Sequence, residues 1–244
     1  MAMNFRIARI VRPTLSVACA AALSSCGGSV CIGFNGCTGP IAAPSLALSG
    51  TAATGRALAS ATVSATCAQG SGATLSDGGG RYSLTFSATL PCVLTVTSGG
   101  TTLHSLAFAG GVFNTTPETQ LMLVYLAAQL GTSEANLLAS LSSDTRLQQA
   151  LSSQSNVQAA QAAVVANLQQ RYMLTLAVPA FLTTPFSVGQ PGVDSDLEAL
   201  QAAGAIDSNG MPDPAAVSLM TQAGVAQPLA KAPTLSAVGA TPGM

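Results

Sequence analysis

The chain offers a single histidine as a general base. His104 lies in the Thr- and Leu-rich run 102–106, and no acidic residue stands next to it in the sequence. A histidine base needs a positioned partner. Any Ser–His–Asp triad would have to use this one residue, in a chain that has no G-x-S-x-G nucleophile elbow. We therefore expect His104 to be a structural or surface residue, and we predict no catalytic residue.

Two groups of carboxylates come closest to metal-ligand patterns. Asp194, Asp196 and Glu198 stand at the start of an expected helix, where the helix dipole accounts for their charge. Residues 207–210 (DSNG) followed by Asp213 are similar to part of a calcium loop. They lack the third alternating ligand and the distal Glu of an EF-hand, and DSNG is a common turn. No metal and no cofactor is predicted.

The N-terminus has the order of charges and apolar residues of a secretory signal peptide. Arg6, Arg9 and Arg12 precede the apolar stretch 15–23, which is too short to span a bilayer as a mature helix. The stretch ends in Leu-Ser-Ser followed by Cys26. This run resembles the lipobox of bacterial lipoproteins; an ordinary cleaved signal with a nearby cysteine is the alternative.

The lipobox resemblance implies where the protein resides. In lipoproteins the peptide is cut before the cysteine, which here would leave residues 1–25 as signal and Cys26 carrying the lipid. One acyl chain holds a protein only marginally at about 0.8 kcal/mol per buried CH₂, whereas three chains would hold it firmly. An Asp after the cysteine favours the inner membrane in Gram-negative lipoproteins. The residue here is Gly27, so we expect the outer membrane, with the protein facing the periplasm or the cell surface.

Composition restricts the partners of the mature chain. Only 7% of the residues are charged, with 8 Lys+Arg and 9 Asp+Glu in all. Removal of residues 1–25 leaves five basic residues and all nine acids, a net charge of about −4. Nucleic acid needs a basic patch and is therefore not an expected partner. The expected partners are the membrane, through the lipid on Cys26, and an envelope protein or a glycan.

Four cysteines remain for disulfides after Cys19 leaves with the signal and Cys26 takes lipid. They are Cys31, Cys37, Cys67 and Cys92. Export places them where disulfides persist. Of the three pairings we prefer 31–37, a small Gly-containing loop, and 67–92, which would join two expected strands. A metal site is the alternative, but these spacings match no zinc pattern.

Residues 45–112 have the rhythm of short strands. Alternating runs at 46–50, 59–67, 81–86, 91–97 and 102–106 are separated by Gly- and Asp-containing turns. Such spacing predicts a small β-sandwich.

This segment also resembles the carboxypeptidase regulatory-like, or transthyretin-like, β-sandwich family. A Gly-x-x-x-x-Gly-x-x-Leu-x-x-Ala-x-Val run and an Asp-x-x-Gly-x-Tyr-x-Leu run carry the resemblance. Their residues here are Gly50, Gly55, Leu58, Ala61, Val63, Asp77, Gly80, Tyr82 and Leu84. The resemblance covers about residues 46–110 and implies a fold, because this fold is attached to many functions. A Gly cluster replaces the family's usual long Thr-rich turn.

Helices are expected after residue 113. Thr116 as N-cap, Pro117 at N1 and Glu118 near the dipole begin a helix over the apolar run 121–130, which ends at Gly131. The stretch 114–126 (NTTPETQLMLVYL) also resembles a segment of uncharacterised bacterial lipoproteins. The sequon at its start is read as helix capping rather than glycosylation.

Four further helical segments are expected. They are one or two short helices in 134–151, a helix from Val157 to about Tyr172 capped by Asn156, one capped by Ser195 and ending near Ala203, and a last one from Pro214 to about Ala223. Residues 178–193 read as a Pro/Gly-rich loop.

The sequence therefore predicts an α+β protein with a small N-terminal Ig-like or prealbumin-like sandwich and a helical C-terminal region. The expected parts are 1–25 signal, 26–44 tether, 45–112 sandwich, 113–224 helical region and 225–244 disordered tail.

We expect an outer-membrane lipoprotein with a non-catalytic structural or binding role. The alternative is a carbohydrate- or peptide-binding accessory module of an envelope enzyme, which the scarcity of aromatics (4%) disfavours. A hydrolase is the third hypothesis and has the least support.

Overall fold

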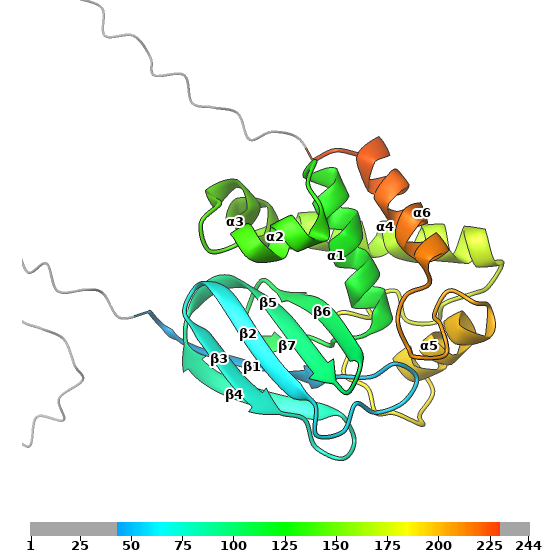
Figure 1. Cartoon of the computed structure of the whole chain (residues 1–244), viewed down its shortest axis with the longest axis horizontal. Helices are drawn as coiled ribbons and strands as arrows, with labels where there is room; N and C mark the ends of the chain where they lie inside the picture. The colour runs from blue at the N-terminus through cyan, green and yellow to red at the C-terminus, as the bar shows by residue number, and fades with distance from the viewer. Residues whose placement is uncertain (1–42, 230–244) are drawn as a thin grey trace, which may run out of the picture. The chain divides into compact units, whose positions relative to one another are not determined.

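The computed structural model describes residues 43–229, which contain two β-sheets followed by six α-helices (Figure 1). The strands are β1 (Ser45–Thr51), β2 (Thr62–Gln69), β3 (Ser71–Leu75), β4 (Arg81–Ser87), β5 (Thr89–Ser98), β6 (Thr101–Ala107) and β7 (Gly111–Val112). The helices are α1 (Pro117–Gln129), α2 (Glu134–Ser140), α3 (Thr145–Ser152), α4 (Gln154–Tyr172), α5 (Val193–Ala202) and α6 (Pro214–Ala226). Strands thus precede helices, as the sequence predicts.

The smaller sheet has the order β4-β1-β7. β1 pairs antiparallel with β4, so that Leu48 faces Leu84, and parallel with the short β7. Apolar side chains alternate along β1, with Leu46 and Leu48 buried and their neighbours more exposed, as expected for a strand with one face on a core.

The larger sheet has the order β3-β2-β5-β6, all antiparallel. Its buried face includes Val63, Leu94 and Leu103, and Phe86 of β4 lies against Gly72 of β3, which brings the two sheets into contact. The strand β3 is absent from the sequence prediction. It is an edge strand whose residues are exposed or half-buried throughout, so it lacks the apolar alternation that reveals a strand.

The turn into β4 forms as its residues suggest. Asp77 Oδ1 accepts from the backbone N–H groups of Gly79 (2.8 Å) and Arg81 (2.9 Å). Gly80 has a φ of +78°, and a Cβ there would strike the carbonyl oxygen of Ala52. Only glycine satisfies both conditions.

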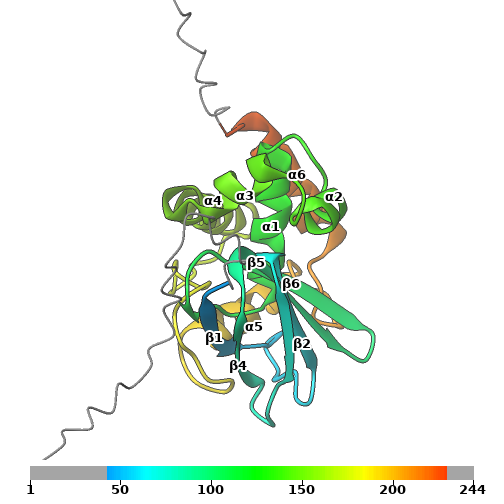
Figure 2. The ribbon, with the colours of Figure 1, turned by 90° about the vertical axis from the view of Figure 1, so that its left-hand side faces the viewer.

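Helix α1 is buried along its whole length. It begins at the predicted N-cap, Thr116, whose side chain accepts from the N–H of Thr119 while Thr119 Oγ1 accepts from the N–H of Thr116. The helix contacts β6, α2, α4 and α6. Figures 1 and 2 show α1 to α4 and α6 gathered at one end of the two sheets.

The first turn of α1 also covers the free edge of β6. Gln120 Oε1 accepts from the backbone N–H of His104 (2.6 Å), and Thr119 Oγ1 donates to the carbonyl of His104 (3.0 Å). These side chains take the place of a further strand, because an uncovered edge exposes unpaired backbone groups. The hydrophobic core therefore continues from the strands into the helices.

Three helix boundaries differ from the sequence prediction. The N-cap of α4 is Ser153 rather than Asn156, whose amide instead donates to the Ala150 carbonyl. The N-cap of α5 is Gly192, and Ser195 sits at N3 with its hydroxyl bonded to the backbone of Gly192.

Helix α6 continues to Ala226 instead of ending near Ala223. Gly224 lies inside this helix, at the point where α6 meets α1, and a Cβ there would strike the Tyr125 carbonyl. Within residues 43–229, no helix combines the length and the apolar character needed to span a bilayer.

Candidate binding pocket

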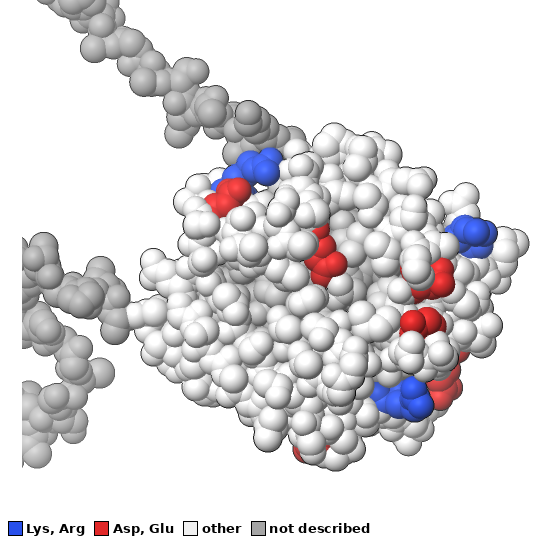
Figure 3. Space-filling model, in the orientation of Figure 1, with Lys and Arg blue, Asp and Glu red and all other residues white. Residues whose placement is uncertain are grey.

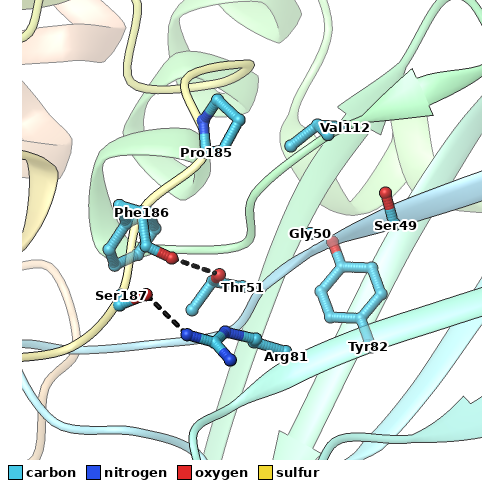
Figure 4. A pocket seen from close by; sticks show the side chains of 9 residues that line it. All are labelled: Ser49, Gly50, Thr51, Arg81, Tyr82, Val112, Pro185, Phe186 and Ser187. Atoms are coloured by element: carbon cyan, nitrogen blue, oxygen red, sulfur yellow. Dashed lines mark hydrogen bonds between the residues drawn. The ribbon is translucent and has the colours of Figure 1, made fainter.

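A pocket of about 350 Å³ lies where residues 185–187 pass beside the small sheet (Figure 4). Three strands and one loop form it. Its lining is Ser49, Gly50 and Thr51 of β1, Arg81 and Tyr82 of β4, Val112 of β7, and Pro185, Phe186 and Ser187 of the loop. It combines apolar surface with hydroxyls and one cation, which is the usual mixture of small-molecule sites.

Two hydrogen bonds across the pocket join loop and sheet. Arg81 Nη2 donates to Ser187 Oγ at 2.7 Å, and Thr51 Oγ1 donates to the Phe186 carbonyl at 3.0 Å. Figure 4 shows both bonds on the same side of the site. No carboxylate of residues 43–229 lies within 4.0 Å of the Arg81 guanidinium, so the group has no ion-pair partner in this part of the chain.

Buried Asn114 holds the loop in place. Its side-chain amide donates to the carbonyls of Phe181 (2.8 Å) and Thr184 (2.7 Å), and its oxygen accepts from the N–H of Thr51 (3.1 Å). The side chain is 0% exposed. Asn114 therefore fastens a loop almost 70 residues away to the end of β1.

The carboxylates at the start of α5 organise the same loop. Asp196 accepts from the N–H groups of Ala177 and Val178, both at 2.8 Å, and Asp194 Oδ2 accepts from the N–H of Gly189 at 2.6 Å. Both carboxylates are buried, whereas Glu198 is exposed. All three lie in the first turns of α5, as predicted, but the first two also supply the loop with its hydrogen-bond acceptors.

Glu118 is the most unusual titratable group of the described residues. It lies in the first turn of α1, as predicted, yet it is 0% exposed and neither carboxylate oxygen has a hydrogen-bond partner. Burial raises the pKa of Glu118 well above its ordinary 4.5, and the negative charge of Asp196 raises it further. The carboxyl group is therefore protonated well above that pH in the folded protein.

This environment predicts a pH-dependent stability. A carboxyl whose pKa is higher in the folded than in the unfolded chain stabilises the fold fully below the unfolded pKa, and that contribution is lost as pH rises through the folded pKa. Glu118→Gln stays neutral and should lose this dependence. In denaturant titrations from pH 5 to 8, the advantage of the variant over the wild type should grow with pH, by up to about 1.4 kcal/mol per pH unit. Parallel pH profiles would show that Glu118 ionises normally.

His104 acquires an acidic neighbour that the sequence does not reveal. Its Nδ1 lies 3.2 Å from Glu134 Oε1, at the start of α2, and 3.1 Å from Gln120 Oε1. The amide of Gln120 also donates to Glu134 at 2.5 Å. The three side chains tie β6 to the N-terminal ends of α1 and α2, which is a structural role.

The disulfide expected between Cys67 and Cys92 is formed. The two residues are register partners on β2 and β5, and both side chains face the core. Cys26, Cys31 and Cys37 lie outside the described residues.

The turn at 207–210 has no metal-ligand cluster. Asp207 Oδ1 accepts from the N–H groups of Asn209 (2.8 Å) and Met211 (2.9 Å), so it serves the turn itself. Within residues 43–229, no three His, Cys, Asp or Glu side chains converge as metal ligands would.

Charge is sparse on the face shown in Figure 3, where a few small groups of charged side chains, some with blue and red side by side, lie on an otherwise uncharged surface. The exposed outward residues of β2, Thr62 and Thr66, typify the hydroxyl-rich sheet.

No protein-family model, curated protein or solved structure is significantly similar to this chain.

The residues that shape the pocket are mostly ones that sequence reasoning missed. Asn114 was singled out only as part of a helix start, and Arg81 only as a member of a strand. The single available signal is the polar run 114–116 shortly before the apolar run 121–128, since a buried Asn needs several partners.

Proposed function

We propose that this chain is a lipid-anchored protein of the bacterial outer membrane with a non-catalytic binding or structural role. The carrying observation is the Leu-Ser-Ser-Cys26 run behind a basic and an apolar segment. The Cys67–Cys92 disulfide supports it, because such bonds persist in oxidising compartments.

The proposal extends to the type of fold. We infer that the two sheets form a transthyretin-like sandwich of the carboxypeptidase regulatory-like kind. The residues that carry the resemblance support this inference through the contacts they make. Gly50 leaves space for the Phe113 carbonyl, which Tyr82 Oη bonds, and Asp77 and Gly80 make the turn before β4. Burial accordingly raises the pKa of Tyr82.

The hydrogen bonds made by the candidate catalytic side chains support the non-catalytic role. His104 is engaged with Gln120 and Glu134, and Asp194 and Asp196 accept from backbone N–H groups. The pocket offers an arginine and hydroxyls with no imidazole or carboxylate among its lining residues. This set is suited to holding a ligand, and it favours a binding role over a purely structural one.

Membrane anchorage is tested by Cys26→Ser. Loss of the thiol removes the acylation site, so the variant should leave the outer-membrane fraction and appear as unprocessed or soluble protein, a change in that fraction from nearly all to nearly none. The wild type should band with the outer membrane on a sucrose gradient. Cys31→Ser is the matched control and should fractionate as the wild type. If Cys26→Ser remained acylated and membrane-bound, anchorage through Cys26 would be wrong.

A further inference from the structure

We propose that the pocket bounded by Arg81 and Phe186 binds a small organic carboxylate with an apolar body. The carboxylate would pair with the Arg81 guanidinium and the apolar body would lie on Val112, Pro185 and Phe186. This proposal rests on the binding role proposed above and gives it a ligand class, but it does not depend on the lipid.

The first support is that Arg81 uses few of its hydrogen-bond donors within the part of the chain that the structure describes. A guanidinium has five N–H donors, of which the structure shows one in use, toward Ser187. That bond ties the exposed Arg81 side chain to the loop that forms the other wall of the pocket. Since planar guanidinium groups pair with carboxylates through two parallel hydrogen bonds, the remaining donors match this anion.

The second support is that hydrogen bonds within the protein already hold the loop that forms one wall of the pocket. The loop opposite Arg81 is fastened through Thr51 to Phe186, through Asn114 to Thr184, and through Asp194 to Gly189. A site held in this way loses little conformational entropy on binding, which favours affinity.

The third support comes from the charge of the residues that line the pocket and from the volume of the pocket. The pocket lining has one cation and no anion, which suits a monoanion better than a phosphate dianion. About 350 Å³ lies at the low end of small-molecule sites, so the ligand has on the order of a dozen heavy atoms. A free organic acid and the C-terminus of a peptide with an apolar last residue share this chemistry.

The test is a ligand-observed NMR titration of the full-length protein in detergent. The probes are N-acetylleucine, its carboxamide N-acetylleucinamide, and an acetylated tripeptide ending in leucine. N-acetylleucine should bind saturably with a Kd on the order of 1 mM, the affinity expected for a ligand of this size. The carboxamide should bind at least tenfold more weakly. A tripeptide that binds more tightly than N-acetylleucine points to peptide C-termini, and one that is excluded points to free acids.

Variants locate the binding. Arg81→Ala should weaken N-acetylleucine at least tenfold, and Arg81→Lys should recover part of the loss, because lysine keeps the charge without the paired geometry. Arg56→Ala is the matched control, since Arg56 is an exposed arginine outside the pocket and should change nothing. The proposal is overturned if neither acid binds, if acid and carboxamide bind equally, or if Arg81→Ala binds as the wild type does in the same micelles. Failure here would leave anchorage through Cys26, which is measured separately, untouched.

Discussion

Replacing both bridged cysteines, Cys67→Ala with Cys92→Ala, should lower the free energy of unfolding by about 3–4 kcal/mol. The bond joins residues 25 apart in sequence on neighbouring strands, and cross-linking a loop of that size restricts the unfolded chain by about this amount in the chain-entropy model. Alanine avoids a new hydroxyl at positions that are 2% and 0% exposed. The loss is a large part of the stability of a single domain.

Guanidinium denaturation of oxidised and reduced wild type provides the control. Reduced wild type should unfold close to the double variant, since both lack the bond. Non-reducing peptide mapping should recover the 67–92 peptide pair. Equal midpoints for oxidised and reduced protein, or peptides pairing either cysteine with Cys31 or Cys37, would contradict the assignment.

Asn114→Ala should destabilise the fold by at least about 3 kcal/mol and loosen the pocket. The substitution strips buried partners from the carbonyls of Phe181 and Thr184 and from the N–H of Thr51. Each orphaned buried group costs about 1–3 kcal/mol. Hydrogen exchange at loop residues 183–190 should accelerate together with the fall in stability, because the loop loses its attachment to β1.

An exposed asparagine provides the comparison. Asn136 lies on the surface of α2, and Asn136→Ala should change stability by no more than about 0.5 kcal/mol. If the two substitutions proved equally mild, Asn114 would not hold the loop in the way its hydrogen bonds indicate.

The parts of the fold that the sequence predicts are those with a local signal. Helix α1 follows from Thr116, Pro117 and the apolar run behind them, and β4 follows from an Asp/Gly turn and strict alternation. β3 has neither signal. The start of α5 was missed because its N-cap, Gly192, has no side chain, while Ser195 three residues later matches an N-cap pattern.

The pocket could not be predicted, because its parts are far apart in sequence. The hydrogen bond between Thr51 and Phe186 joins residues 135 apart in the sequence, and the one between Thr51 and Asn114 joins residues 63 apart. The same holds for His104, whose neighbour Glu134 belongs to the helix that follows α1. A sequence pattern reports local structure, and these contacts depend on how the loop and helices pack onto the sheets.

The intact mass of the detergent-extracted protein tests lipid anchorage through Cys26. We expect a chain that begins at Cys26, carries acyl groups on that residue, and gains two hydrogens on reduction for each disulfide it contains, at least one. A chain with an unmodified Cys26, or one beginning at another residue, would contradict the proposal that this protein is a lipid-anchored component of the cell envelope.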